Sequence, residues 1–345
     1  MKKIALFIST ILIILAIIAF WILMGPSVNA TNEKYFYIHT GDKYEDVLAN
    51  LKEKKILSNY FTFDLLASYT GYKKQVKPGK YEISKGMSVF KLNRMLKSGS
   101  QHDVRLVITK LRTKEDFAKK IGSNFEADSL EVIRFLLSND SLAPYQLDSN
   151  TVMSVLIPNS YLFWWNGSFK KILDRLKKQH DYFWEGKRTI KAKSLGLTPL
   201  EIYTIASIVE EETTKETDKG LIASVYINRF KKGMKLEACP TVKYAMRDFG
   251  LKRILQGHLD YPSPYNTYIK TGLPPGPICT PSINTIDAVL NAPKTDYLFF
   301  SAKSDFKGYS NFASNYEQHL LFARAYQKAL DTMILRKKAK QIEKN

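Results

Sequence analysis

The chain has 345 residues, of which 45% are hydrophobic, and a formal net charge of +19. This length exceeds what one compact core usually needs, so we expect two soluble units with accessory segments. The hydrophobic content excludes a disordered chain, and the charge indicates an anionic partner such as lipid headgroups or an acidic polymer. The basic residues are scattered without a nucleic-acid-binding signature, so no nucleic-acid partner is expected. The histidines and the two cysteines show no metal-ligand spacing, and we expect neither metal nor cofactor.

The N-terminus predicts a membrane anchor. Residues 4–25 carry no charge and are numerous enough to cross a bilayer as a helix. Lys2 and Lys3 precede them, so residues 1–3 are expected to form a cytoplasmic tail and the rest of the chain to lie outside. A cleaved signal peptide is the alternative, because Val-Asn-Ala at 28–30 resembles a cleavage site, but the apolar stretch is longer than signal peptides usually have. We therefore expect a retained, single-pass transmembrane helix.

Three segments beyond the anchor share one pattern, in which a short apolar strand precedes a turn and a short amphipathic helix. The expected strands are Tyr35–Ile38, Lys80–Ile83 and Val104–Ile108. In the expected helices, over 41–51, 86–96 and 111–121, apolar side chains recur four residues apart and so share one face. The pattern predicts a small α+β module, and coincidental patterning within an ordinary α+β domain is the alternative.

Residues 122–197 have a mainly helical pattern with one aromatic insertion at Asn159–Gly167 (NSYLFWWNG). Aromatic rings beside Asn and Gly suit a surface on which sugar rings stack. Clustered aromatic side chains are more often part of a core, and we expect a core role for most of these.

A helix that begins at Thr198 ends in three consecutive glutamates. Thr198 and Glu201 form the sequence signature of a capping box, with proline at the first helical position. At about 100° per residue, Glu211 falls opposite the apolar side and is expected to be solvated. Glu210 and Glu212 fall on the two flanks, where burial or a neighbouring carboxylate raises the pKa of an acid that must protonate a leaving oxygen. The helical wheel therefore leaves Glu210 and Glu212 as alternatives for the catalytic acid.

Five fragments follow one another in and after this helix: Ala206–Thr213 (ASIVEEET), Ser224–Phe230 (SVYINRF), Pro240–Val242 (PTV), Tyr265–Tyr268 (YNTY) and Gly272–Ile278 (GLPPGPI). In this order and spacing they resemble the YceG-like, or MltG, family of endolytic murein transglycosylases. In that family the catalytic acid is the glutamate directly after Ala-Ser-Ile-Val or its equivalent, which is Glu210 here. The chain departs from the family pattern at Cys239, where Asp is usual, and at Glu237, where Gln is usual.

The resemblance implies an α+β protein with a LysM-like membrane-proximal module over 35–105, a catalytic domain over 106–335 and a basic C-terminal tail over 336–345. It implies cleavage of the MurNAc–GlcNAc β-1,4 bond of nascent peptidoglycan strands to give 1,6-anhydro-MurNAc ends, outside the bacterial cytoplasmic membrane. It also implies work beside peptidoglycan synthases, the penicillin-binding proteins. The two alternatives are a glycoside hydrolase with Glu237 or Asp260 as second carboxylate and a non-catalytic glycan-binding scaffold.

A lytic transglycosylase can act with one carboxyl group, because the C6 hydroxyl of muramic acid replaces the water of a hydrolase. Polar side chains in the five fragments would hold sugar hydroxyl and acetamido groups. The expected substrate-binding residues are Glu212, Asn228, Thr241, Tyr265, Asn266 and Tyr268. Cys239 and Cys279 are expected to remain free, with a disulfide between them as the alternative.

Overall fold

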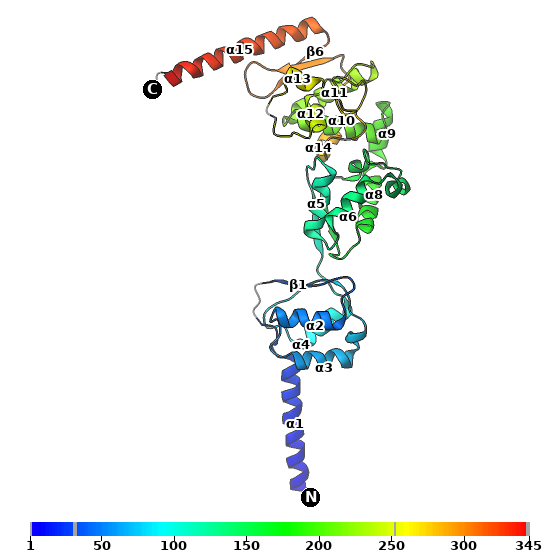
Figure 1. Ribbon diagram of the computed structural model, residues 1–345, viewed down its shortest axis with the longest axis vertical. Helices are drawn as coiled ribbons and strands as arrows, with labels where there is room; N and C mark the ends of the chain where they lie inside the picture. The colour runs from blue at the N-terminus through cyan, green and yellow to red at the C-terminus, as the bar shows by residue number, and fades with distance from the viewer. Residues whose placement is uncertain (1, 30–32, 252, 343–345) are drawn as a thin grey trace. The chain divides into compact units, whose positions relative to one another are not determined.

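The computed structural model describes residues 2–29, 33–251 and 253–342, and it has a mixed α+β fold (Figure 1). The chain divides into two compact units, each with its own hydrophobic core. The first unit contains Met1–Leu106, Ile121–Asp128 and Tyr161–Ile172, and the second contains Val107–Lys120, Ser129–Ser160 and Leu173–Asn345. The expectation of two units in an α+β chain is thus confirmed, although segments of the chain alternate between them.

The N-terminal helix α1 (Lys2–Met24) is long and apolar enough over Lys3–Met24 to cross a membrane. It leads directly into the first unit, because an isolated β-bridge joins Pro26 to Ser88 and another joins Val28 to Leu57. The Val28 side chain is buried in that unit's core. Ala30 of the alternative cleavage site lies outside the described residues.

A two-stranded antiparallel sheet and three helices form the rest of the module that follows α1. Strand β1 (Tyr35–Ile38) pairs with β2 (Gly79–Glu82), with Phe36 opposite Tyr81. The helices are α2 (Tyr44–Glu53), α3 (Tyr60–Thr70) and α4 (Val89–Ser98), with a 3-10 turn η1 (Tyr72–Lys74) after α3. Apolar side chains from every one of these elements fill the core. The predicted strand-turn-helix pattern is confirmed for β1 with α2 and for β2 with α4.

The third copy of the pattern also forms a strand and a helix, β3 (Val104–Ile108) and α5 (Lys114–Asn124), but in another sheet. Strand β3 pairs with β4 (Asn159–Phe163), which the sequence analysis treated only as part of an aromatic insertion. Tyr161, Phe163 and Trp165 of that insertion are buried, whereas the Trp164 side chain is 62% exposed. The expected core role is therefore confirmed for all but one of these aromatic residues.

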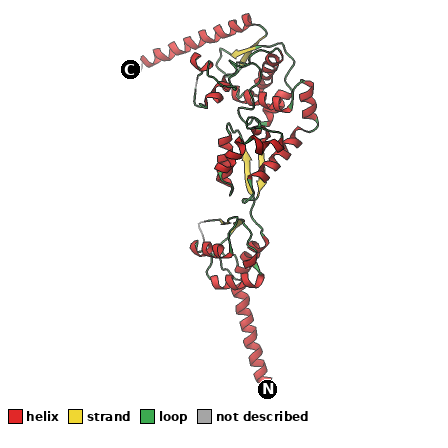
Figure 2. Ribbon diagram, turned by 45° about the vertical axis from the view of Figure 1, so that its right-hand side comes forward, coloured by secondary structure: helices red, strands yellow, loops and turns green. Residues whose placement is uncertain are grey.

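Helices dominate the second unit, and the red ribbon of Figure 2 shows how few strands accompany them. They are α6 (Ser129–Leu137), α7 (Asn139–Leu142), α8 (Phe169–Trp184), α9 (Lys187–Ser194), α10 (Pro199–Glu212), α11 (Glu216–Lys231), α12 (Cys239–Met246), α13 (Gln256–Leu259), α14 (Ile283–Leu290) and α15 (Tyr316–Ile342), with 3-10 turns η2 (Ala143–Tyr145) and η3 (Val152–Val155). The first residues of α8, up to Ile172, belong to the first unit. Strands β5 (Phe299–Ala302) and β6 (Ser310–Ala313) form an antiparallel pair. The last three residues of the expected basic tail lie outside the described residues.

Helix α10 is the centre of the second unit's core and contacts α11, α12 and α14. The predicted capping box is confirmed, since Thr198 Oγ1 accepts from the Glu201 amide and the Glu201 carboxylate accepts from the Thr198 amide. Residues 202–209 are buried on every side, so burial of this helix extends beyond the apolar side that the helical wheel identified. Polar side chains are tolerated there because they are satisfied locally: Tyr203 donates to the Leu156 carbonyl and Ser207 to the Thr204 carbonyl.

Candidate active site

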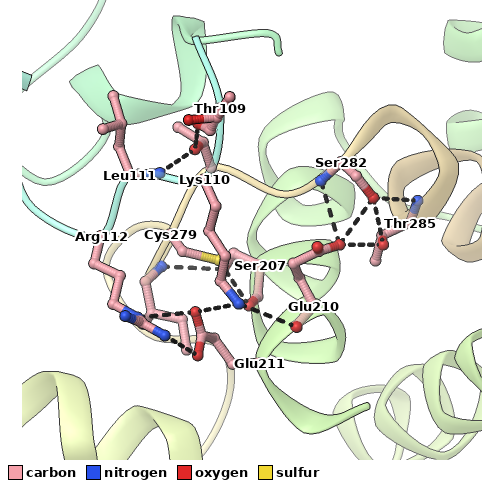
Figure 3. A network of polar contacts seen from close by, with 12 residues as sticks. Thr109, Lys110, Leu111, Arg112, Ser207, Glu210, Glu211, Cys279, Ser282 and Thr285 are labelled. Atoms are coloured by element: carbon pink, nitrogen blue, oxygen red, sulfur yellow. Dashed lines mark hydrogen bonds and ion pairs between the residues drawn. The ribbon is translucent and has the colours of Figure 1, made fainter. Parts of the chain in front are cut away.

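The C-terminal turn of α10 directs three consecutive glutamates toward three different neighbours. Successive helical residues are rotated by about 100°, so Glu210, Glu211 and Glu212 leave the helix on different sides. Figure 3 shows the first two: the carboxylate of Glu210 faces Ser282 and Thr285, and that of Glu211 faces Lys110 and Arg112. Because these glutamates lie in partly buried surroundings, the neighbours of each one set its hydrogen bonds and ion pairs.

Glu210 caps the start of helix α14. Its Oε2 atom accepts hydrogen bonds from the amide and hydroxyl of Ser282, at 3.3 and 2.9 Å, and from the hydroxyl of Thr285. The buried ammonium group of Lys219 lies 3.8 Å from the same oxygen. A carboxylate at a helix N-terminus is stabilising, because free amide groups and the helix dipole meet it there. This side chain therefore joins α10, α11 and α14.

Glu211 forms an ion pair on the opposite side, so the prediction that it is solvated is wrong. Its side chain is only 16% exposed and lies 2.8 Å from the Lys110 ammonium and 3.1 Å from the Arg112 guanidinium. Arg112 binds it in a bidentate manner through Nε and Nη2. Burial alone would raise the pKa of Glu211, but hydrogen bonds from Arg112 and Lys110 outweigh it and lower the pKa. The physical reason for the error is that a segment 100 residues earlier in the chain covers this side of α10.

Glu212 lines a cavity of about 300 Å³ and has an unusual titration behaviour. Its Oε1 atom accepts a 2.7 Å hydrogen bond from the phenol of Tyr226. Burial raises the pKa of the Glu212 carboxyl to about 7, and the Tyr226 hydrogen bond and the charge of Lys243 offset only part of this rise. A carboxyl group with this pKa exists in both protonation states near neutral pH, as a group that donates and then accepts a proton must.

The cavity beside Glu212 combines polar groups with aromatic rings. Its other lining residues are Arg229, Leu236, Glu237, Cys239, Tyr268, Phe299, Phe300, Tyr316 and His319. Arg229 organises one wall, since its guanidinium donates to the Leu236 and Leu298 carbonyls and to the Glu237 carboxylate. Cys239 Sγ lies 3.1 Å from the Tyr268 hydroxyl. Aromatic faces beside a few fixed polar groups are what a sugar-binding cavity needs.

Of the expected substrate-binding residues, Tyr268 lines this cavity together with Glu212. The others make structural hydrogen bonds. Asn228 donates to the Thr295 and Tyr297 carbonyls. Thr241, which is fully buried, donates to the Ala238 carbonyl.

Asn266 and Tyr265 belong to this structural group too. Buried Asn266 donates to the Leu259 and Tyr261 carbonyls and so closes the loop between them. Tyr265 donates to Asn150, and its ring centroid lies 4.8 Å from that of Tyr244. These side chains therefore shape the loops near the cavity without lining it.

Tyr226 and Arg229 are the functional candidates that sequence reasoning missed. Both lie in the fragment Ser224–Phe230, and their positions on α11 are three residues apart, which places them on one helix face. The three-residue spacing was the signal that the sequence offered for pairing these two residues. It does not show that Tyr226 reaches Glu212, because that contact depends on how α11 packs against α10. Cys239 and Cys279 are free thiols, as expected. Within the described residues no group of three or more His, Cys, Asp or Glu side chains is arranged to hold a metal ion.

A titratable carboxyl group in an aromatic-lined polar cavity is the arrangement of an enzyme that uses general acid–base catalysis. A model of the YceG-like family matches residues 36–325, and the chain belongs to that family. An endolytic murein transglycosylase of Bacillus subtilis (strain 168) is 29% identical over 286 residues, which is 78% of each chain. A protein of the same name from Streptococcus pneumoniae (strain D39) is 27% identical over 85% of this chain, which spans 58% of that relative's length. The crystal structure of a putative YceG-like protein from Listeria monocytogenes is similar, with a TM-score of 0.54 and 27% identity over 84% of this chain and 99% of that one.

Proposed function

We propose that this protein is a membrane-anchored lytic transglycosylase that cuts the glycan strands of peptidoglycan. Membership of the YceG-like family supports the proposal, and so do relatives from two genera that are named endolytic murein transglycosylases. The apolar helix α1 fits an anchor that keeps the enzyme at the membrane. The single observation that carries a catalytic rather than a scaffolding function is the Glu212 carboxyl group, whose pKa is raised to about 7 beside an open cavity.

Glu212, in place of Glu210, is the general acid in this proposal. Glu210 is engaged by the amide of Ser282, two hydroxyl groups and Lys219. These contacts hold its side chain at the start of α14, and Glu210 is not among the residues that line the cavity beside Glu212. Within the described residues Tyr226 is the hydrogen-bond donor to the Glu212 side chain, and Glu212 lines the cavity in which a substrate would bind.

The chemistry follows from one carboxyl group that acts twice. Protonated Glu212 donates its proton to the glycosidic oxygen while the bond from that oxygen to C1 of muramic acid breaks. The Glu212 carboxylate then accepts the proton of the C6 hydroxyl as its oxygen bonds to C1, which closes a 1,6-anhydro ring and restores the acid. No water is consumed, so no second catalytic carboxylate is needed. Tyr268, near Glu212 in the same cavity, is the candidate for contact with the sugar.

The finer features of this proposal concern location and partners. The compact module after α1 would be LysM-like and bind glycan, and Lys2 and Lys3 would hold the N-terminus in the cytoplasm so that both units lie outside. The tight connection of Val28 to this module supports a retained anchor over a cleaved signal peptide. Work beside peptidoglycan synthases would follow from acting on newly made strands.

The test uses purified full-length protein, intact glycan strands and mass spectrometry of the products. Glu212→Gln keeps the shape of the side chain but can neither donate nor accept the proton, so we expect activity to fall by a factor of about 10²–10⁴ or more. Glu210→Gln is the matched control, two residues earlier on the other flank of α10. It is expected to lower stability while the folded fraction retains cleavage. A dead Glu210 variant beside an active Glu212 variant would transfer the acid role to Glu210.

A glycoside hydrolase is the second candidate function, because Glu237 lines the same cavity as Glu212. Glu237 is paired with Arg229 at 2.8 Å, which favours a structural carboxylate over a second catalytic one. The products separate the two reactions: 1,6-anhydro ends support the transglycosylase, and reducing ends that disappear in Glu237→Gln support the hydrolase. Intact strands with wild-type protein would leave only a glycan-binding scaffold.

A further inference from the structure

Helix α3 carries an apolar stripe that nothing in the described part of the protein covers. Phe61, Leu65 and Tyr69 recur four residues apart and therefore lie along one face of the helix. Their side chains are 76%, 60% and 89% exposed. The opposite face of α3, which includes Phe63 and Leu66, is buried in the core of the module. The helix is thus apolar on both sides, which an ordinary solvated surface helix is not.

The start of α3 is fastened to the point where the chain leaves α1. The Ser58 amide donates to the Ser27 carbonyl at 2.9 Å, and the Ser58 hydroxyl donates to Asn29. Asn59 caps the first turn of α3 one residue later. Leu23, in the last turn of α1, packs against the module's core. Figure 1 shows α3 crossing the end of α1, with α2 on the far side of the module.

The neighbouring helix α4 adds positive charge next to the same junction. It contacts both α1 and α3. Its exposed face carries Lys91, Arg94 and Lys97, three residues apart. Among the described residues of the module, the ion pairs of lysine side chains involve Lys34, Lys54 and Lys73 and not these three cations. Cationic side chains beside an apolar stripe match the chemistry of a bilayer surface, where phosphate groups lie above acyl chains.

We propose that α3 lies in the outer surface of the membrane that α1 spans, with Phe61, Leu65 and Tyr69 among the headgroups and upper acyl chains. This inference rests on the proposed anchoring role of α1 and adds a second contact, made by the folded module itself. An interfacial helix of this kind inserts by ~5–10 Å. A second copy of the chain is a poorer occupant, because each copy carries a net charge of +19 and the cations of α4 flank the stripe. The two contacts together fix the orientation of the module on the bilayer.

The experiment places nitroxide labels on the full-length protein in liposomes that contain anionic phospholipid. Leu65→Cys reports on the stripe, and Glu45→Cys, on the exposed face of α2, is the matched control. Leu12→Cys reports whether α1 spans the bilayer. All three are made in a Cys239→Ser, Cys279→Ser background whose circular dichroism matches the unchanged protein. Each label is measured for collision with oxygen, which concentrates in lipid, and with a nickel chelate that remains in water.

The expected result is an oxygen-to-nickel collision ratio several-fold higher at position 65 than at position 45, unchanged when the protein is diluted in lipid. Equal ratios at the two positions, with position 12 shielded from nickel, would overturn the α3 contact and leave the anchor intact. Shielding of position 65 that disappears on dilution would assign the stripe to a second copy and also overturn the proposal. Access of nickel to position 12 would remove the anchor and, with it, this inference.

Discussion

At the scale of single residues, the environment gives three identical side chains three different roles. Glu210 is held by helix α14 and Lys219, and Glu211 is held by two cations. Glu212 accepts a hydrogen bond from the phenol of Tyr226 and lines a cavity. Hydrogen-bond donors and cations favour the charged form of a carboxyl group, and burial without them favours the neutral form. The proposed catalytic acid is Glu212, whose pKa is raised by burial.

Tyr226→Phe tests whether the Tyr226 hydrogen bond sets the pKa of Glu212. This bond favours the carboxylate and so lowers the pKa, and its removal should raise the pKa above about 7. The alkaline limb of kcat/KM against pH reports the protonated acid, so we expect that limb to move upward by about one pH unit, the equivalent of one hydrogen bond to a charged group.

Tyr268→Phe is the matched control for that profile. The Tyr268 hydroxyl lies in the same cavity, but its hydrogen-bond partner is Cys239 and not Glu212. Its loss is expected to change KM while the alkaline limb remains in place. An unchanged limb in Tyr226→Phe would show that Tyr226 does not act on the acid.

The sequence narrowed the acid to the two flanks of α10 but could not choose between them on physical grounds. A helical wheel gives the direction in which Glu210 and Glu212 leave the helix, and it contains no information about what lies there. Ser282 and Thr285, which engage Glu210, follow more than 70 residues later in the chain. Tyr226 lies only 14 residues from Glu212, yet its contact depends on how α11 folds back on α10. The substrate candidates Asn228 and Thr241 show the same limit, since a polar residue in a loop-rich fragment can equally serve the loop.

At the scale of elements, local sequence signals predicted where helices and strands begin and end, but they did not predict how deeply each element is buried. The short strands β1, β2 and β3 lie within one residue of their expected bounds, because their apolar runs end at turn residues. The expected helix over 41–51 begins at Tyr44, since the first residues form the turn and the cap. Helix α10 also begins where its capping box predicts. The burial of residues 202–209 on every side was not predictable, because Tyr203 and Ser207 read as polar until their hydrogen bonds to carbonyl groups are known.

Glu211→Gln tests whether the ion pair fastens the segment at 110–112 to α10. The substitution leaves the Lys110 and Arg112 charges beside a neutral, 16% exposed side chain, so we expect the free energy of unfolding to fall by about 1–3 kcal/mol. Thermal unfolding of the full-length protein, followed by circular dichroism, measures the change.

Glu115→Gln is the control for this effect, because Glu115 pairs with Arg247 at 3.1 Å where both side chains are about half exposed. An exposed pair of this kind contributes about 0–1 kcal/mol. Equal thermal unfolding midpoints for the two variants would show that the ion pair of Glu211 stabilises the protein no more than a surface ion pair does.

At the scale of the whole molecule, the apolar helix α1 is compatible with a membrane anchor for the chain. Within the described residues α1 is the only helix long and apolar enough to cross a membrane, and its most apolar stretch is not buried inside the protein. The module that follows has no separate linker at this point, since Ser27 and Val28 bond to the Met87 carbonyl. A peptidoglycan-cutting enzyme must lie on the outer side of the membrane, so the orientation of α1 is a condition of the proposed activity.

A reporter fused to the C-terminus tests this orientation. Lys2 and Lys3 begin α1, ahead of its apolar stretch, and the positive-inside rule keeps them in the cytoplasm, so the C-terminus is expected outside. An alkaline phosphatase fusion, which is active only after export, should therefore be active, and a cytoplasm-dependent β-galactosidase fusion should not. The paired variant Lys2→Glu, Lys3→Glu removes the charge that sets the orientation and is expected to shift part of the population toward the β-galactosidase-active state. Strong β-galactosidase activity in the unchanged protein would place the catalytic unit in the cytoplasm, away from peptidoglycan, and would contradict the substrate as well as the topology.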